Sequence, residues 1–471
     1  MNFHSSTYGF FFIVVFTLFW LLRARRRERT ILLLLASWFF YASWNAKYLL
    51  LIIFSTVLDY WVGLSLGKLD PKLPENQKKR RLLLLASLVG NLGCLGTFKY
   101  YGFFRENIEF LLSGFGIHIP HLNVLLPVGI SFYTFQTLSY TIEVYWGKLE
   151  PKKSFIDFAL FVAFFPQLVA GPIVRASHFL PQIQRFPRID RNDFMRGLYR
   201  IAEGLGKKVL LADLLGAHLV DKTFIHGSPI EGLQALFAIY GYAIQIYCDF
   251  SGYSDIAIGS AMLLGFKIPE NFNAPFKARN VRDFWRRWHL SLSTWLRDYL
   301  YIPLGGNRKG EFRTYLNLFI TMALGGLWHG ASWSYVVFGV IHGVWLAGTR
   351  WYDKKGFPAF PGRIGKIIAI FLTFHVFCLS LFIFRANDFT LAWEVLMRVG
   401  RPWHIPNMSP YVWAALIVGF ISHYLPETTK KRVEEMFVGL PAPLVGFFWV
   451  FFIGLIAAAK EESIPFIYFQ F

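Results

Sequence analysis

The sequence predicts an all-α, polytopic membrane protein, and its composition and its apolar runs both support this fold class. Of its 471 residues, 55% are hydrophobic and 19% are aromatic, while only 16% are charged. Soluble domains usually carry about 25% charged residues, so this chain has too little charge to cover a water-facing surface. Its apolar residues also gather into runs of about 20 residues, which is the length that a helix needs to cross a bilayer.

The basic residues predict how the helices are oriented. The net charge is +19, which in a soluble protein would raise the question of nucleic acid. Here Lys and Arg gather in short segments between apolar runs, as they do in cytoplasmic loops, where they also contact anionic lipid. Basic segments follow the first run (residues 23–29) and the third run (residues 68–81). Because successive spans cross the membrane in alternating directions, both segments lie on the same side, the cytoplasm. We therefore expect a multi-pass protein whose N-terminus is outside. Its expected partner is the lipid bilayer, and binding of nucleic acid is not expected.

About eleven transmembrane or re-entrant helices are predicted, together with further helices at the interface. The two longest runs, Leu233–Phe266 and Leu316–Leu346, are long enough to break into two pieces or to tilt strongly. Arg191–Asp221 mixes charges with Leu and Val at helical spacing and predicts one or two interfacial helices. No shift in composition marks a soluble extra domain, so residues 1–471 are predicted to form a single membrane-embedded domain. In chain order the predicted spans are Tyr8–Leu22, Thr30–Trp44, Tyr48–Leu66, Leu82–Phe98, Val124–Trp146, Phe155–Val174, Leu233–Phe266, Leu316–Leu346, Ile367–Phe384, Tyr411–Tyr424 and Leu440–Ala459.

The segment Asn280–Leu304 is predicted to be one helix with an aromatic face and a basic face. Asp283 and Arg287 are spaced for an i,i+4 ion pair. Two interpretations stay open: an interfacial helix whose arginines bind lipid phosphates, or a helix in a cavity that offers arginine to an anionic substrate. The basic face consists of Arg282, Arg286, His289, Ser293 and Arg297. On that face His289 could be a ligand contact, a relay or a surface residue.

His329 lies near the middle of the apolar run Leu316–Leu346. An ionisable side chain at the membrane centre is costly, so we expect it to face a bundle interior or a cavity and to have a function. Apolar surroundings disfavour the imidazolium form, and a neutral ring can accept a proton as a general base. Gly325, Gly326 and Gly330 would let another backbone or a ligand approach closely. The alternative is a structural histidine bonded to a neighbouring helix.

Four further ionisable residues lie in apolar runs. His342 and His375 are expected to form hydrogen bonds between helices. Asp249 and Asp255 could orient a base, bind a cation or pair with an arginine of the basic segment. Pairing is favoured because it costs least in a low dielectric.

Several catalytic signatures are missing from the sequence. It has neither GxxxxGK[ST] nor HExxH, which argues against an ATP-driven pump and against that kind of zinc protease. Cys94, Cys248 and Cys378 have no disulfide or zinc spacing. GLSLG at Gly63–Gly67 matches a GxSxG elbow only in its letters, because it ends an apolar span instead of a strand. No metal and no tightly bound cofactor are predicted.

Three stretches of the chain resemble the membrane-bound O-acyltransferase family: Phe164–Ile183, Cys248–Gly310 and Gly325–Gly343. The most similar branch is the bacterial alginate O-acetyltransferase membrane subunit. The peptidoglycan O-acetyltransferase membrane subunit and the D-alanyl transfer protein of teichoic acid modification are related to that branch. The resemblance implies a helical fold around a central cavity or tunnel, in a bacterial cytoplasmic (inner) membrane. It also implies that His329, in the WHG segment, is catalytic and that His289 is a second functional position.

The resemblance further implies a donor and a partner. Family members typically take an acyl group from the thioester of coenzyme A or of an acyl carrier phosphopantetheine arm. Members of this branch usually work with a periplasmic SGNH-type partner that completes transfer to a polysaccharide. The hypothesis is that His329 takes the proton of the acceptor hydroxyl while His289 or Trp328 helps to place the reacting groups. The candidate substrate-binding residues are Trp328, Arg286, Arg287, Arg297, Ser293 and Asp249.

Two other functions stay open from the sequence. The chain could move D-alanine or another acyl group to a cell-wall polymer. It could also be a transporter of polymer or lipid without acyl chemistry, in which glycine-broken helices form a gate.

Overall fold

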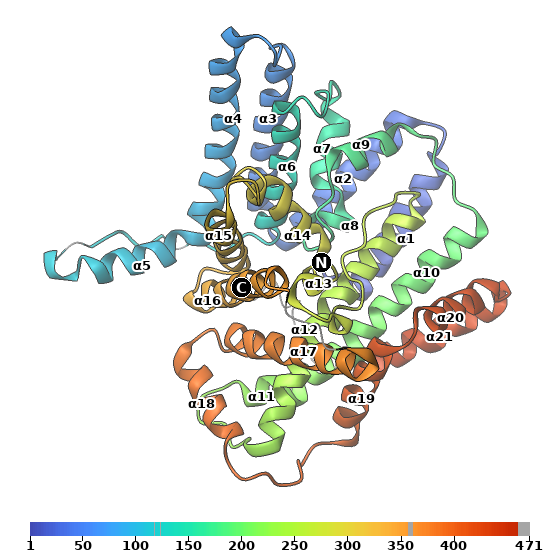
Figure 1. The fold of residues 1–471 in the computed structure, drawn as a ribbon. Helices are drawn as coiled ribbons and strands as arrows, with labels where there is room; N and C mark the ends of the chain where they lie inside the picture. The colour runs from blue at the N-terminus through green and yellow to red at the C-terminus, as the bar shows by residue number, and fades with distance from the viewer. Residues whose placement is uncertain (117, 123, 357–360, 460–471) are drawn as a thin grey trace. The chain divides into compact units, whose positions relative to one another are not determined.

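The computed structural model describes residues 1–116, 118–122, 124–356 and 361–459, and every regular element in these ranges is a helix (Figure 1). The predicted all-α class is therefore confirmed. The chain divides into two compact units. The first comprises Met1–Gly197 and Ala257–Pro269, and the second comprises Leu198–Ile256 and Glu270–Phe471. One membrane-embedded domain over residues 1–471 stays a prediction.

Four stretches of helix in the described residues are long and apolar enough to cross a membrane. Two shorter apolar helices, Ser6–Leu21 and Pro410–Tyr424, also coincide with predicted spans. Large apolar side chains such as Phe10, Leu50 and Phe447 are exposed on these helices, as a lipid-facing surface requires. The four long stretches are Arg26–Gly67, Pro74–Leu111, Gly362–Ala386 and Ala442–Ala459.

The first unit is built on a group of helices in which α3, α4 and α6 pack against one another (Figure 1). Helix α1 begins where the Ser5 hydroxyl accepts a hydrogen bond from Tyr8 N, and α4 begins at Pro74, whose missing N–H costs nothing in a first turn. The helices of this unit include α1 (Ser6–Leu21), α2 (Arg26–Asn45), α3 (Leu49–Gly67), α4 (Pro74–Leu95), α5 (Tyr101–Leu111), α6 (Ile130–Tyr145), α7 (Phe155–Ala163), α8 (Phe165–Leu168) and α9 (Ala176–Gln184).

The predicted continuous span Phe155–Val174 is wrong. Helix α7 ends at Ala163, Phe164 leaves the helical region with ψ 111°, and only the single turn α8 follows. Pro166 explains why the helix does not continue, because proline lacks an N–H and fits only the first turn of a helix.

The remaining helices belong to the second unit, except that α10 and α12 each have residues in both units. α12 is one unbroken helix of 32 residues, so the run Leu233–Phe266 does not break, whereas the run Leu316–Leu346 breaks between α15 and α16. The bounds are α10 (Arg191–Leu205), η4 (Gly206–Asp213), η5 (Gly216–Val220), α11 (Asp221–Thr223), α12 (Gly232–Leu263), α13 (Val281–Trp285), α14 (Leu290–Leu296), η7 (Arg297–Tyr301), α15 (Glu311–His329), α16 (Trp333–Lys354), α17 (Gly362–Ala386), α18 (Phe389–Val399), α19 (Pro410–Tyr424), α20 (Glu427–Gly439) and α21 (Ala442–Ala459).

Glycines allow α15 and α16 to pack with their backbones in contact. A Cβ atom on Gly326 would lie 2.1 Å from Tyr335 O, and one on Gly339 would lie 2.2 Å from Met322 O. Only a residue without a side chain fits at such a separation. The predicted close approach near His329 is thus made by the protein's own backbone.

Buried ion pairs join η4 to α12. Lys208 Nζ lies 2.7 Å from Asp249 Oδ1, and Asp255 contacts both Lys207 Nζ and Arg200 Nε at 2.8 Å. The predicted pairing of the two aspartates is confirmed, but the predicted partner is wrong. Their cations come from α10 and η4, because that segment is helical over its whole length and places its basic side chains against α12.

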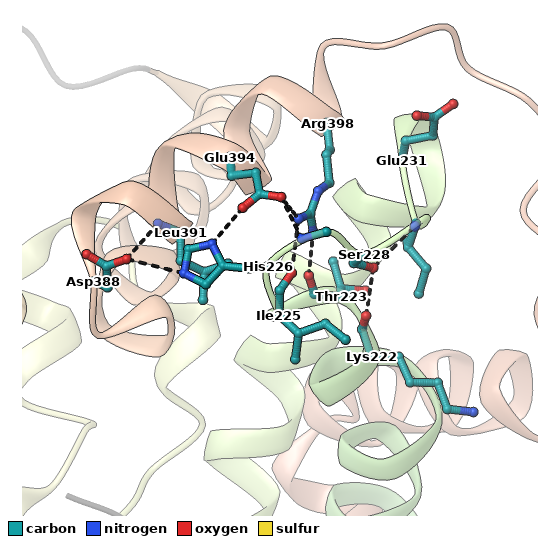
Figure 2. Close-up of polar contacts among 12 residues, drawn as sticks. Lys222, Thr223, Ile225, His226, Ser228, Glu231, Asp388, Leu391, Glu394 and Arg398 are labelled. Carbon is teal, nitrogen blue, oxygen red and sulfur yellow. Dashed lines mark hydrogen bonds and ion pairs between the residues drawn. The ribbon is translucent and has the colours of Figure 1, made fainter.

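A polar cluster ties the loop between α11 and α12 to α18 (Figure 2). Arg398 donates from Nη1 to Thr223 O at 2.9 Å and from Nη2 to Ile225 O at 3.0 Å. His226 Nδ1 lies 2.8 Å from Glu394 Oε2, and its Nε2 lies 3.6 Å from Asp388 Oδ2. We call His226, Asp388, Glu394 and Arg398 the loop clamp.

Candidate active site

His289 lies in a turn between α13 and α14, so the prediction of one helix over Asn280–Leu304 is wrong. Its backbone is left-handed, with φ 44° and ψ 55°, a conformation that a non-glycine residue adopts only when its surroundings enforce it. The loop between α12 and α13 enforces this conformation. Its residue Asn273 donates from N to Arg287 O at 2.9 Å, and Leu290 N donates to Asn271 O at 3.0 Å. These bonds replace helical bonds and turn the chain.

Asn271 fixes the hydrogen positions of the His289 ring. Its side-chain Oδ1 accepts from Ser291 N at 3.2 Å and from Ser291 Oγ at 2.9 Å. A backbone N–H can only donate, so the atom facing it must be the amide oxygen. His289 Nδ1 lies 3.2 Å from the same oxygen and therefore carries the hydrogen. The ring lone pair is on Nε2, which is the atom that can accept a proton.

Aromatic rings surround His289 on two sides. The ring centroid of Phe250, on α12, lies 4.7 Å away at 85°, and that of Trp328, on α15, lies 5.7 Å away at 70°. The His289 side chain is completely buried and lies outside the helices that are long enough to cross a membrane. Its burial, and next the nearby His329, lower the pKa of His289. This ring is therefore neutral at pH 7.

His329 is the last residue of α15 and lies directly beside this aromatic group. Its ring centroid is 5.2 Å from that of Trp328 and 5.5 Å from that of Phe384. The backbone becomes extended at Gly330, where a Cβ atom would lie 2.2 Å from the Tyr335 ring. The glycine thus ends the helix and leaves His329 at the break, buried in the second unit.

The structure brings three of the predicted site residues together and ties a fourth to them. His289 and His329 both contact the ring of Trp328, which is itself buried. Ser293 lies one helical turn beyond His289, and its N donates to His289 O at 2.9 Å while its Oγ donates to Trp288 O at 3.1 Å.

The other predicted substrate contacts have protein partners or lie at the surface. Arg287 forms the predicted pair with Asp283 at 2.8 Å, Arg297 pairs with Asp298 at 2.7 Å, and Asp249 pairs with Lys208. Arg286 is exposed. Arg286 and Arg297 are both exposed and can contact an anion in solution. Asp249 is buried against Lys208, which leaves it poorly placed to contact a substrate.

His342 and His375 bond between helices, as predicted. His342 Nε2 lies 3.0 Å from Ser380 Oγ on α17, and Trp285 Nε1 donates to its Nδ1 at 3.3 Å. His375 Nε2 lies 2.9 Å from the Tyr240 hydroxyl on α12. Each ring has protein partners that account for its position without a substrate.

Comparison with known proteins decides what kind of enzyme this arrangement belongs to. The sequence pattern of MBOAT, the membrane-bound O-acyltransferase family, matches residues 148–386, which include His289, Trp328 and His329. The chain belongs to this family. The predicted resemblance is therefore confirmed, and this MBOAT protein is a multi-pass membrane O-acyltransferase.

Relatives of this MBOAT protein are found in several bacteria. It is 43% identical over 384 residues to the probable alginate O-acetylase AlgI of Pseudomonas aeruginosa, covering 80% of this chain and 71% of the relative. It is 38% identical over 382 residues to the peptidoglycan O-acetyltransferase of Helicobacter pylori, covering 76% and 71%. It is 31% identical over 290 residues to the teichoic acid D-alanyltransferase of Bacillus subtilis, covering 58% and 71%.

Sequence reasoning missed Asn271. It stands in the stretch PENFNAPF, where neither periodicity nor spacing relates it to a histidine 18 positions later. The side chain of Asn271 is polar, but its contacts with His289 and Ser291 arise only because its segment folds back onto residues 289–291. The sequence alone does not show this.

Proposed function

We propose that this protein moves an acetyl group from a cytosolic thioester across the membrane toward hydroxyls of an exported polysaccharide, with alginate as the first polymer to test. The observation that carries the proposal is the meeting of His289, Trp328 and His329 in one buried aromatic group. The 43% identity to a probable alginate O-acetylase supports the choice of acyl group and polymer. The proposal includes about eleven transmembrane or re-entrant helices, a central cavity or tunnel, and an N-terminus outside a bacterial inner membrane.

The proposed reaction is a direct acyl transfer. The acceptor oxygen attacks the thioester carbonyl carbon while the neutral ring of His329 takes the hydroxyl proton. The carbon–sulfur bond then breaks, and the leaving thiolate takes the proton back from the imidazolium. General-base catalysis of this kind contributes about 10² to 10⁴ in rate. His289 presents Nε2 as a hydrogen-bond acceptor that orients the reacting groups, and Trp328 fixes the spacing of the two rings.

The proposed donor is acetyl-CoA or an acetylated carrier protein, and it acts as a substrate, since no tightly bound cofactor is proposed. Arg286 and Arg297 are the candidate contacts for its phosphate groups, because both are exposed and arginine matches phosphate geometry. Arg287 is bound to Asp283 and is proposed to hold the turn before His289. A periplasmic SGNH-type partner is proposed to complete transfer to the polymer.

The test uses purified protein in proteoliposomes with labelled acetyl-CoA and, separately, with a labelled acetylated carrier protein. Alginate oligosaccharide and the candidate SGNH partner are supplied on the opposite side. Label in the oligosaccharide or on the partner with one of the two donors is the expected result. Absence of transfer with both donors, from protein shown to be folded, would contradict the proposal.

D-alanyl transfer is the less favoured substrate. The identity to the teichoic acid D-alanyltransferase is 31% over 58% of this chain, compared with 43% over 80% for the probable alginate O-acetylase. The same assay with a D-alanyl carrier thioester separates the two. A transporter without acyl chemistry is set aside, because the chain belongs to a family of acyltransferases.

A further inference from the structure

Asp59 is a completely buried carboxylate in α3, inside the first unit. From α4, Ser87 Oγ donates to its Oδ1 at 2.5 Å and Asn91 Nδ2 donates to its Oδ2 at 2.9 Å. From α6, the hydroxyls of Thr137 and Thr141 face the same carboxylate. Because α3 belongs to a helical stretch that is apolar enough to cross a membrane, an ionisable residue here is costly and indicates a function.

The hydrogen bonds around Asp59 are those of an ionised carboxylate. Asn91 Nδ2 also donates to Ser87 O at 3.0 Å, and a carbonyl oxygen can only accept. The amide is therefore oriented with its NH₂ group toward Asp59, so that this side chain gives hydrogen bonds to the carboxylate. With Ser87 donating to the other oxygen, both oxygens of Asp59 act as acceptors, which suits the charged form.

No cationic side chain in the described part of the chain balances this charge. The side chains that donate hydrogen bonds to Asp59 there, Ser87 and Asn91, are neutral. The equally buried Asp249 and Asp255 of the second unit differ, since each contacts a lysine within 2.8 Å. A buried charge without a partner is strongly unfavourable. A bound cation or a proton on the carboxylate itself would neutralise Asp59.

A buried oxygen atom beside the carboxylate points to what that partner is. Thr141 Oγ1 makes no hydrogen bond of ordinary geometry with the described residues, and its side chain is completely buried. With the carboxylate of Asp59 and the hydroxyl oxygen atoms of Ser87 and Thr137 it forms a set of oxygen ligands without sulfur or imidazole, which suits a hard cation. A single carboxylate matches a single positive charge, whereas calcium sites usually combine several carboxylates.

We propose that α3, α4 and α6 bind a sodium ion at this place. The ligands are Asp59, Ser87, Thr137 and Thr141. Sodium would neutralise the one negative charge and give the buried Thr141 oxygen a partner. It would thereby hold three helices of the first unit together. This site is separate from the proposed acyl-transfer chemistry, so failure of either proposal leaves the other standing.

The test measures thermal unfolding of the detergent-purified full chain in sodium, potassium and choline chloride at equal ionic strength. A ligand that binds only the folded state raises the unfolding temperature as its concentration rises. We expect a saturable rise with sodium that potassium and choline do not reproduce. Asp59→Asn keeps the size of the side chain but removes the charge, and it should abolish the sodium-specific rise.

Asp157→Asn is the matched control. Asp157 is also a buried aspartate of the first unit, but it contacts Arg26 Nη2 at 2.8 Å and Lys152 Nζ at 3.0 Å. This variant should keep the sodium-specific rise. If Asp59→Asn fails to fold, Thr141→Val gives the second measurement, since it removes one oxygen at nearly constant shape and should raise the half-saturating sodium concentration several-fold.

Two results would overturn the proposal. One is an unfolding temperature of the natural protein that is the same in all three salts. The other is an unfolding temperature that follows pH but not sodium, which would show that Asp59 is neutralised by a proton. Both results leave acyl transfer, measured separately with labelled donor, unaffected.

Discussion

His289 and His226 both belong to the second unit, and they show how surroundings decide the chemistry of the same side chain. The His289 ring is 0% exposed and faces the uncharged amide oxygen of Asn271. The His226 side chain is 61% exposed and faces two carboxylates, those of Glu394 and Asp388. An amide oxygen orients the buried ring of His289, whereas two carboxylates hold the His226 ring at an exposed position.

The difference explains why only one of these regions suits acyl transfer. A general base must be neutral in the resting state and must present a lone pair toward the substrate. His289 meets both conditions in its buried aromatic setting. The loop clamp instead uses its histidine to hold a loop against α18 (Figure 2).

The largest predicted effect separates the two histidine regions by activity. His329→Ala should lower the rate of labelled acyl transfer by about 10² to 10⁴, because it removes the proposed general base. His226→Ala should leave that rate within about twofold, since surface positions away from the site contribute little. An equal loss in the two variants, or full activity of His329→Ala in membranes that contain normal amounts of protein, would contradict the distinction.

The second prediction extends the comparison to buried charges. Lys208→Met leaves Asp249 buried without its cation, and breaking such a pair costs about 3 to 5 kcal/mol of stability. The double variant Lys208→Met/Asp249→Leu should recover part of that loss, because the buried Asp249 carboxylate is then removed as well, whereas Asp213, which lies 2.7 Å from Lys208 Nζ, still lacks the lysine. Thermal unfolding in detergent measures both. Equal stability of the single and double variants would show that Asp249 does not depend on this lysine.

The third prediction tests the amide partner of His289. Asn271→Ala should lower the transfer rate about 10- to 100-fold, as loss of an orienting neighbour commonly does. Asn271→Asp places a carboxylate against Nδ1, so the acid limb of the pH–rate profile should move to higher pH. Ser291→Ala, which removes only one donor to the same Asn271 oxygen, should leave the position of that limb unchanged. An unchanged profile in Asn271→Asp would remove the assigned role.

The smallest predicted effect concerns the loop clamp at acid pH. The Gly227 N–H, Arg398 and His226 lower the pKa of Glu394 to about 2, and the backbone N–H groups of Leu391 and Thr390 lower the pKa of Asp388. A carboxyl group with a lowered pKa stabilises the fold above its unfolded-state pKa and loses that contribution as pH falls toward its folded-state pKa. For Glu394 this loss is spread between about pH 4.5 and 2.

Hydrogen exchange of residues 224–231 measures the effect on the clamp. Exchange in the natural protein should keep the same protection between pH 7 and pH 5, after correction for intrinsic rates, and lose protection toward pH 3. Glu394→Gln should exchange faster already at pH 7, because it weakens the contacts to Arg398 and His226. Identical protection in the natural and variant proteins would show that Glu394 does not hold the loop.

Much of the helical architecture could be predicted from the sequence, because apolar runs such as Tyr8–Leu22 and Tyr411–Tyr424 coincide with helices of the structure, Ser6–Leu21 and Pro410–Tyr424. His329 could be singled out because a histidine in an apolar run is unusual. The turn at His289 could not, since helical spacing on both sides of it is regular and only the backbone of residues 271–273 forces the break.

Partnerships between distant segments account for the other omissions. Asp249 was expected to meet an arginine of the basic segment, but the choice between several basic segments depends on how α10 and η4 lie against α12. Asn271 and Asp59 stand in the sequence without any pattern around them. Their surroundings come from residues 17 or more positions away, which one-dimensional spacing does not relate.

The central claim is that acyl transfer takes place where His289, Trp328 and His329 meet. An experimental structure with a non-hydrolysable thioether analogue of acetyl-CoA tests it most directly. The account predicts that the acetyl carbonyl of the analogue lies within hydrogen-bond reach of a ring nitrogen of His329 or of His289 Nε2. An analogue bound elsewhere, with both rings closed off by apolar side chains and no path to either from solvent, would contradict it.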